Sequence, residues 1–300
     1  MKIGSRLKEL QRIAYMHRCT ILKSFSKSWN NINISQSEPY IIHDYIISKA
    51  SGIKYLNKTI PPVFRNYGFI VKFAGVFIHQ KPIIQRKNTA CAPRRRNCEL
   101  GDLLTLFLFV DSSKNILLKK AFISQAKKNQ KNIHSKNCQT CLYEKDQEFT
   151  YYRFKTLNGA IRRLPTYPKR YFSLNYLILS TNKNIIDPFI IPPSFFEFSC
   201  KFKWNFVLFN TLIGCYGLNF GNNSGNGWSK IIWDLINVTG SSLFGKRGHR
   251  ANYLNELLNY FNDFDNYEKT FLETEDEYSE GIPMLLIIIQ DKEIKLQVKQ

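Results

Sequence analysis

The feature that most constrains the fold is a pair of apolar segments joined by a short polar turn. Residues 102–110 read Asp-Leu-Leu-Thr-Leu-Phe-Leu-Phe-Val, and residues 116–126 form a second run rich in aliphatic side chains. Between them, residues 111–115 read Asp-Ser-Ser-Lys-Asn, which is typical of a tight turn. Two such runs at this separation predict an antiparallel hairpin of largely buried strands.

The position of the turn predicts which residues of the two strands face each other. If the turn centres between Ser113 and Lys114, then Asp102 lies directly across from Gln125. Gln125 and Lys127 share one face of their strand because side chains alternate, and directly opposed partners share that face too. We therefore expect an acid, an amide and an ammonium group to converge at one end of the hairpin. Such a cluster can bind a hard cation and a water molecule beside a phosphate.

The segments Glu99-Leu-Gly-Asp102 and Gln125-Ala-Lys127 resemble the motif of the PD-(D/E)XK nuclease superfamily, which has the restriction-endonuclease-like fold. In that superfamily, an acid begins one strand, and an acid or glutamine, any residue and a lysine follow on the next. The Gln-x-Lys version resembles the Mrr-type branch, and the resemblance covers roughly residues 38–130. It implies a metal-dependent endonuclease that hydrolyses DNA with Mg²⁺ or Mn²⁺, in restriction, repair or defence.

The resemblance also implies roles for individual residues. Asp102 and Gln125 would bind the metal ion through oxygen, and Lys127 would hold the attacking water and stabilise charge on the phosphate. Glutamine in place of an acid removes one negative charge, so a third carboxylate is expected to contribute. Glu99, just before the strand, and Glu38, near the start of a predicted helix, are equal candidates for this catalytic and metal-binding role. For Glu38, the ordinary alternative is an acid that complements the helix dipole.

The charge of the chain points to a polyanionic partner. Lysine and arginine number 43 against 23 acids, a formal net charge of +20, which makes nucleic acid the first candidate and, with the resemblance, DNA rather than RNA. Part of the lysine excess is also typical of the codon usage of an AT-rich genome. The side chains expected to contact the nucleic-acid backbone are Arg94, Arg95, Arg96, His79, Lys128, Lys246 and Arg247.

The seven cysteines form an odd and scattered set, which predicts reduced thiols in a cytoplasmic protein rather than a disulfide framework. Cys138-Gln-Thr-Cys141 has Cys91 and Cys98 upstream and His134 nearby, an arrangement compatible with zinc. One CxxC without a second pair at familiar spacing is a weak indication, so the zinc question stays open. No signal-peptide core and no apolar run of membrane-spanning length is apparent, and we expect no membrane partner.

Helical and strand patterns mix along the chain, which predicts an α/β protein. We expect a restriction-endonuclease-like mixed sheet in which the central hairpin (102–127) is flanked by helices. The expected parts are a basic helical segment (1–37), a nuclease-like core (38–200), and a mostly helical C-terminal extension (201–300) that packs on the core and ends in a strand. Two other functions stay open: a catalytically inactive nucleic-acid-binding protein of the same fold, and an interaction protein with no nucleic-acid role. A homodimer is compatible with either.

Overall fold

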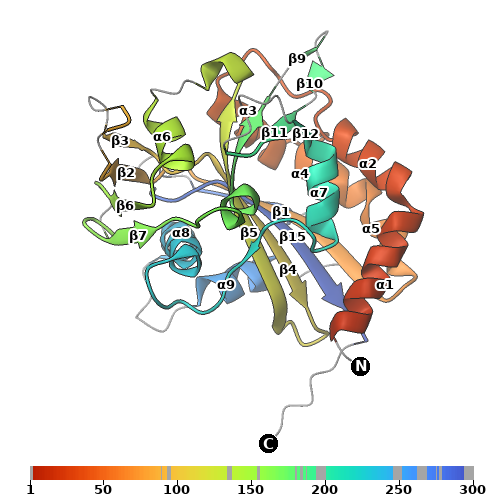
Figure 1. Cartoon of the computed structure of the whole chain (residues 1–300). Helices are drawn as coiled ribbons and strands as arrows, with labels where there is room; N and C mark the ends of the chain where they lie inside the picture. The colour runs from red at the N-terminus through yellow and green to blue at the C-terminus, as the bar shows by residue number, and fades with distance from the viewer. Residues whose placement is uncertain are drawn as a thin grey trace, which may run out of the picture.

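A mixed β-sheet forms the centre of the molecule, with helices on both of its faces (Figure 1). This is a computed structural model of the chain. It describes residues 3–88, 90–92, 96–133, 137–153, 156–179, 181–182, 185–186, 188–193, 201–245, 252–261, 269–274, 276 and 279–293. The predicted α/β class, with a mixed sheet flanked by helices, is confirmed.

Within the described residues the sheet has nine strands, in the order β12-β11-β8-β5-β4-β15-β1-β14, with β13 paired to β5. β4 is antiparallel to β5 and parallel to β15, and β5 is parallel to β8, so the hairpin occupies the middle of the sheet. The strands are β1 (Phe69–Phe77), β4 (Leu103–Val110), β5 (Ile116–Lys127), β8 (Leu174–Ile178), β11 (Phe189–Ile191), β12 (Phe202–Lys203), β13 (Leu218–Asn219), β14 (Phe271–Glu273) and β15 (Met284–Asp291).

The predicted register of the hairpin is confirmed. Leu103 pairs with Ser124, and the same register continues along the hairpin until a shift at Phe109 and Val110. The backbone N–H of Asp102 donates to the carbonyl of Ser124 at 2.9 Å, which extends the ladder so that Asp102 faces Gln125. Alternation of side chains therefore places Asp102, Gln125 and Lys127 on one face of the sheet.

The turn of the hairpin is held by its own polar side chains. Asp111 accepts hydrogen bonds from the backbone N–H and the side-chain amide of Asn115, at 2.8 and 2.9 Å. Lys114 adopts a left-handed conformation with φ of 70°, as a tight turn between two strands requires. The local sequence thus determines where the chain reverses, and the register shift at Phe109 and Val110 then sets the pairing at the other end of the hairpin.

One face of the sheet is covered by the N-terminal helices and α7, which lie together on the same side in Figure 1. Leu103, Phe107 and Phe109 of β4 point into this layer. The predicted basic helical segment (1–37) contains two helices, which are separated at His17. The helices of this layer are α1 (Ile3–Met16), α2 (Arg18–Lys27), α3 (Glu38–Ile47), α4 (Gly52–Thr59), α5 (Pro61–Arg65) and α7 (Trp204–Leu212).

The other face carries α6, α8, α9 and a small sheet of order β3-β2-β6-β7. Leu104, Leu106 and Leu108 of β4 point into this second core, so both faces of the hairpin are buried. Its elements are α6 (Cys138–Glu144), α8 (Trp228–Phe244), α9 (Tyr253–Tyr260), β2 (Ile83–Arg86), β3 (Asn97–Glu99), β6 (Glu148–Tyr151) and β7 (Ile161–Arg163). Shorter elements are β9 (Thr181–Asn182), β10 (Ile185–Ile186), and the 3-10 turns η1 (Gln130–Asn132) and η2 (Lys169–Phe172).

The C-terminal strand β15 lies between β1 and β4, at the centre of the sheet. It pairs antiparallel with β1 and parallel with β4, and all of its residues are buried. A strand buried on both faces is expected to be continuously apolar, as the Leu-Leu-Ile-Ile-Ile run is. The C-terminal residues therefore complete the core of the fold as well as extending it with helices. No helix in the described part of the chain has the length and apolarity needed to span a membrane.

A buried ion pair joins the two ends of the chain. The guanidinium of Arg6 on α1 donates to both carboxylate oxygens of Asp291 at the end of β15, at 2.7 and 3.0 Å. Both side chains are almost fully buried. Although α1 is part of a basic segment, this arginine is therefore used for packing and is not available to an external anion.

We predict that Arg6→Ala lowers the free energy of unfolding by about 3–5 kcal/mol, because the buried Asp291 carboxylate loses its counter-ion and keeps the backbone N–H of Glu293 as a donor. Arg12→Ala, on the exposed side of the same helix, should change it by no more than about 0.5 kcal/mol. Urea denaturation followed by circular dichroism measures both. Equal effects of the two substitutions would contradict this role of Arg6.

Candidate functional site

The candidate site lies at the open end of the hairpin, where β5 runs beyond the start of β4. The backbone N–H groups of Ala126 and Lys128 point toward β4 but have no strand residue opposite them. Asp102 Oδ2 accepts from Ala126 N at 2.7 Å, and Glu38 Oε1 accepts from Lys128 N at 3.1 Å. Both carboxylates thus satisfy backbone donors that would otherwise be unpaired, and Asp102 does so while nearly buried.

Gln125 contacts Asp102 directly, as the register requires. Its amide nitrogen donates to Oδ2 of Asp102. Its amide oxygen is buried and has no hydrogen-bond partner. A buried acceptor without a partner is costly, so this oxygen is a group that a cation or a donor from a ligand would stabilise.

Lys81, in the segment between β1 and β2, was not predicted from the sequence. Its ammonium pairs with Oδ1 of Asp102 and lies 3.5 Å from Oε2 of Glu99. Burial acts to lower the pKa of Lys81, but the charges and hydrogen bonds of Asp102 and Glu99 outweigh it and the pKa is raised. Lys81 is therefore a permanent cation that bridges the two carboxylates.

Glu99 on β3 is the second carboxylate of the cluster, and its side chain is 38 % exposed. Burial is the largest cause that raises its pKa. The ammonium groups of Lys81 and Lys127 act in the opposite direction, whereas the neighbouring Asp102 carboxylate raises the pKa further. The net result is a carboxylic acid with a raised pKa that still reaches solvent.

Lys127 completes the cluster from the end of β5. It is half-buried, and its ammonium donates to the side-chain oxygen of Gln139 on α6 at 2.9 Å. Its charge also acts on Glu99, so the two groups are electrostatic neighbours. Gln139 is a second residue that the sequence did not indicate, because α6 approaches β5 only in the folded chain.

The structure thus brings together four of the predicted catalytic residues: Asp102, Gln125, Lys127 and Glu99. Glu38 was an equal candidate for the third carboxylate, but it belongs to α3 in the opposite helical layer and contacts the backbone of Lys128. The geometry therefore favours Glu99. The Lys128 ammonium donates to the carbonyl of Ser35 at 3.2 Å, which directs it away from Asp102 and toward the N-terminal segment.

The other predicted nucleic-acid contacts are not part of this cluster. His79 lies 4.0 Å from Glu273 of the edge strand β14 and contacts the ring of Phe77, so it belongs to the far edge of the sheet. Arg96 is exposed, and its carbonyl accepts the backbone N–H of Arg86 at 2.9 Å. Four further predicted contacts lie outside the described residues: Arg94, Arg95, Lys246 and Arg247.

A cavity of about 680 Å³ lies beside the end of β5. Ile178, which lines it, is the residue of β8 that pairs with Lys127. Lys131 and Lys201, both exposed, give its wall a positive charge. The full lining is Asn129, Gln130, Lys131, Ile133, Ile178, Phe189 and Lys201.

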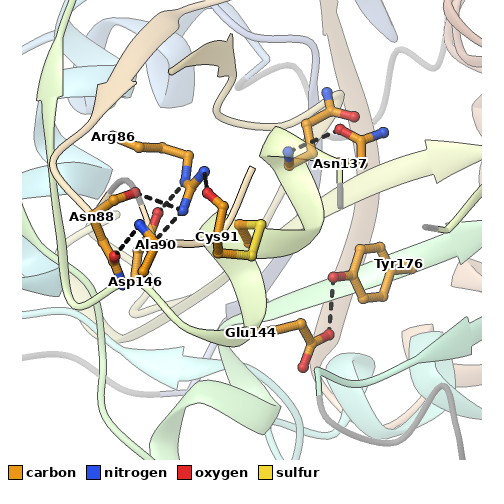
Figure 2. The surroundings of a disulfide bond; sticks show 10 residues. Arg86, Asn88, Ala90, Cys91, Asn137, Glu144, Asp146 and Tyr176 are labelled. Atoms are coloured by element: carbon orange, nitrogen blue, oxygen red, sulfur yellow. Dashed lines mark hydrogen bonds and ion pairs between the residues drawn. A yellow bond between two sulfur atoms is a disulfide. The ribbon is translucent and has the colours of Figure 1, made fainter. Parts of the chain in front are cut away.

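The prediction that the cysteines are all reduced thiols is wrong for this structure. Cys91 and Cys141 form a disulfide, drawn in Figure 2 beside the ion pair of Arg86 and Asp146. The two cysteines are 50 residues apart, so no local pattern predicts their pairing. In the described part of the chain, no three or more His, Cys, Asp or Glu side chains are arranged to hold a metal ion.

No protein-family model, curated protein or solved structure matches the chain. The chemistry of the site must therefore be inferred from its geometry and from the motif.

We predict that Lys81→Ala lowers the free energy of unfolding by about 3 kcal/mol near neutral pH, because two adjacent carboxylates lose their shared counter-ion. Lys87→Ala, which removes an exposed pairing with Glu148, should have a much smaller effect on the free energy of unfolding. Because the pKa of Glu99 is raised, its carboxylate is neutralised early as the pH falls, so the difference between the two variants should decrease in acid. Denaturation at the two pH values tests this, and a Lys81 effect that does not depend on pH would contradict the bridging role.

Proposed function

We propose that this protein is a metal-dependent nuclease that hydrolyses phosphodiester bonds in DNA. The observation that carries the proposal is the convergence of Asp102, Gln125 and Lys127 on one face at the open end of a central hairpin. A restriction-endonuclease-like core and a role in restriction, repair or defence belong to the same proposal, and they rest on the motif. The central place of the hairpin in a mixed sheet supports this assignment.

The donor set suits a hard divalent cation. Asp102 and Glu99 offer carboxylate oxygens, and Gln125 offers the buried amide oxygen that has no partner. Oxygen ligands of this kind are those that Mg²⁺ prefers, and Mn²⁺ accepts them too. Bound there, the ion would supply Lewis acidity to a phosphate oxygen. The Lys81 ammonium lies between the same two carboxylates, so it must withdraw from at least one of them.

Three side chains of the site would bind the phosphate, transfer a proton and compensate charge. Lys127, held by Gln139, presents a fixed ammonium at the edge of the site, where it can donate to a phosphate oxygen or to the attacking water. Glu99 reaches solvent and has a raised pKa, which suits a group that accepts a proton from water. Lys81 offsets the negative charge of the carboxylates as a phosphate approaches.

The basic cavity next to Lys127 gives the DNA backbone a place to bind. Lys131 and Lys201 line it, and the chain carries a net charge of +20. Ammonium groups that contact phosphates release condensed counterions, so such binding weakens as salt increases. Phosphates held in this cavity would lie beside Ile178, the strand neighbour of Lys127.

One observation favours a second function, that of a catalytically inactive nucleic-acid-binding protein. Lys81 and Lys127 together already offset the charges of Asp102 and Glu99, and Gln125 removes a carboxylate from the motif. A cluster whose charge is balanced internally has less need of a metal ion. The basic cavity would then serve binding alone.

We predict that the protein cleaves plasmid DNA with Mg²⁺ or Mn²⁺ and that Asp102→Ala and Lys127→Ala each reduce cleavage by about 100-fold or more. Lys127→Ala should stay folded, because the side chain is only half-buried and the substitution removes one hydrogen bond, to Gln139. Lys23→Ala, on the exposed surface of α2, is the control and should cleave as the wild type does.

Gel electrophoresis of cleaved plasmid and thermal melts of each variant distinguish the two functions. DNA binding that is unaffected by EDTA, without cleavage in either metal, would overturn the nuclease proposal in favour of the binding protein. Neither binding nor cleavage would overturn both and leave an interaction protein.

For binding, we predict that replacing Lys131 and Lys201 together by alanine weakens DNA affinity and lowers the slope of log K against log salt by about 2, near 0.9 for each lost phosphate contact. The control pair Lys8→Ala and Lys23→Ala removes the same charge from the exposed faces of α1 and α2 and should leave the slope unchanged. Fluorescence anisotropy over a salt series measures it. An equal change for the two pairs would show that net charge alone controls binding.

A further inference from the structure

Four of the seven cysteines gather at one place, although they come from two distant parts of the chain. Cys141 on α6 is bonded to Cys91, with their Cα atoms 5.8 Å apart. Cys138, one turn earlier on α6, shares a hydrogen bond with Cys98 of β3. Residues three apart lie on the same face of a helix, so the two sulfur pairs are neighbours.

The environment of these sulfurs is that of an internal site. Cys138 and Cys141 are buried, Cys91 is 9 % exposed, and Cys98 is half-buried. Four cysteines, two of them in a C-x-x-C pair, are the ligand types of a structural zinc site. With the disulfide closed, they do not form such a site, in agreement with the absence of a metal-binding group among the described residues. Soft thiolates in a closed tetrahedral arrangement select zinc over the hard cations that carboxylates bind.

A buried arginine, ion-paired with Asp146, lies beside the cluster. Arg86 donates to the carbonyl of Cys91 at 2.6 Å and to Asp146 at 2.9 Å, as Figure 2 shows. Its charge acts on both Cys98 and Cys138, and it contributes to a lowered pKa of Cys138, after the hydrogen bond from Cys98. A neighbouring cation favours thiolates and offsets the negative charge of a metal–thiolate centre.

We propose that Cys91, Cys98, Cys138 and Cys141 bind one Zn²⁺ when all four are reduced, and that the Cys91–Cys141 disulfide is the oxidised form of this site. A thiol reductant supplies the two electrons and two protons that convert the disulfide into two thiols. Zinc binding then releases the four thiol protons and forms four Zn–S bonds. With the disulfide closed, only Cys98 and Cys138 of the cluster carry free thiols, too few for a metal site.

Such a site would fix two residues at the open end of the hairpin, where Asp102, Gln125, Lys127 and Glu99 form what we call the hairpin cluster. Glu99 directly follows Cys98, and Gln139, the partner of Lys127, lies between Cys138 and Cys141. Zinc would therefore join β3 to α6 and hold Glu99 and Gln139 beside Asp102 and Lys127. This positioning role rests on the proposed nuclease function, whereas zinc binding does not.

The test is the metal content of the full chain, purified with a phosphine reductant and without chelators from cells supplied with zinc. We expect about one zinc ion per chain by mass spectrometry of metals. Cys98→Ser and Cys138→Ser should each lower zinc retention at least tenfold after dialysis. Cys19→Ser and Cys215→Ser, which replace exposed thiols outside the cluster, are the matched controls and should retain it.

A second measurement keeps the proposal falsifiable if the cluster variants do not fold. Titration of the wild-type protein with a mercurial should release zinc into a colorimetric indicator, in step with modification of the four cluster thiols. The proposal would be overturned if the four thiols of the reduced wild-type protein react with a disulfide reagent, yet the protein contains no zinc and takes none up. Lys127→Ala, which should stay folded, should retain zinc while it loses cleavage, so failure of the nuclease proposal and failure of the zinc proposal give different results.

Discussion

The interaction on which the rest of the site depends is the solvation of the Asp102 carboxylate by the protein. A buried charge is tolerated only when donors replace its lost water. Here the donors are the ammonium of Lys81, the amide of Gln125 and the backbone N–H of Ala126, which come from two separate segments of the chain. The same carboxylate therefore closes the end of the hairpin and attaches the segment after β1 to it. Structure and proposed chemistry are not separable at this residue.

Lys81 decides how the cluster would respond to a metal ion and a phosphate. Two unit charges 4 Å apart interact by about 4 kcal/mol at an effective dielectric constant of 20, and a divalent ion doubles the attraction. The gain must exceed the cost of separating Lys81 from a carboxylate and of removing water from the ion. A phosphate adds negative charge on the solvent side of the cluster, where Lys127 and Glu99 lie. Its charge would stabilise both the Lys127 ammonium and the bound metal ion.

The four-cysteine cluster and the hairpin cluster are connected, because residues next to each other in the chain belong to the two sites. β3 contributes Cys98 to one and Glu99 to the other, and α6 contributes Cys138 and Gln139 in the same way. β3 is short and lies at the edge of the small sheet, where it pairs with β2, and Tyr143 of α6 donates a hydrogen bond to the carbonyl of Leu100, directly after Glu99. A covalent or metal cross-link at the sulfurs would limit movement of Glu99 relative to Lys127.

The sequence alone determined the hairpin, its register and the shared face of Asp102, Gln125 and Lys127. It could do so because turn chemistry and the alternation of side chains are local properties of a strand pair. Only the tertiary structure decided that Lys81 and Gln139 complete the cluster, that Glu99 rather than Glu38 lies beside Asp102, and that Cys91 meets Cys141. It also placed β15 in the middle of the sheet. These contacts join segments far apart in the chain, and they depend on how whole layers pack, which no local pattern encodes.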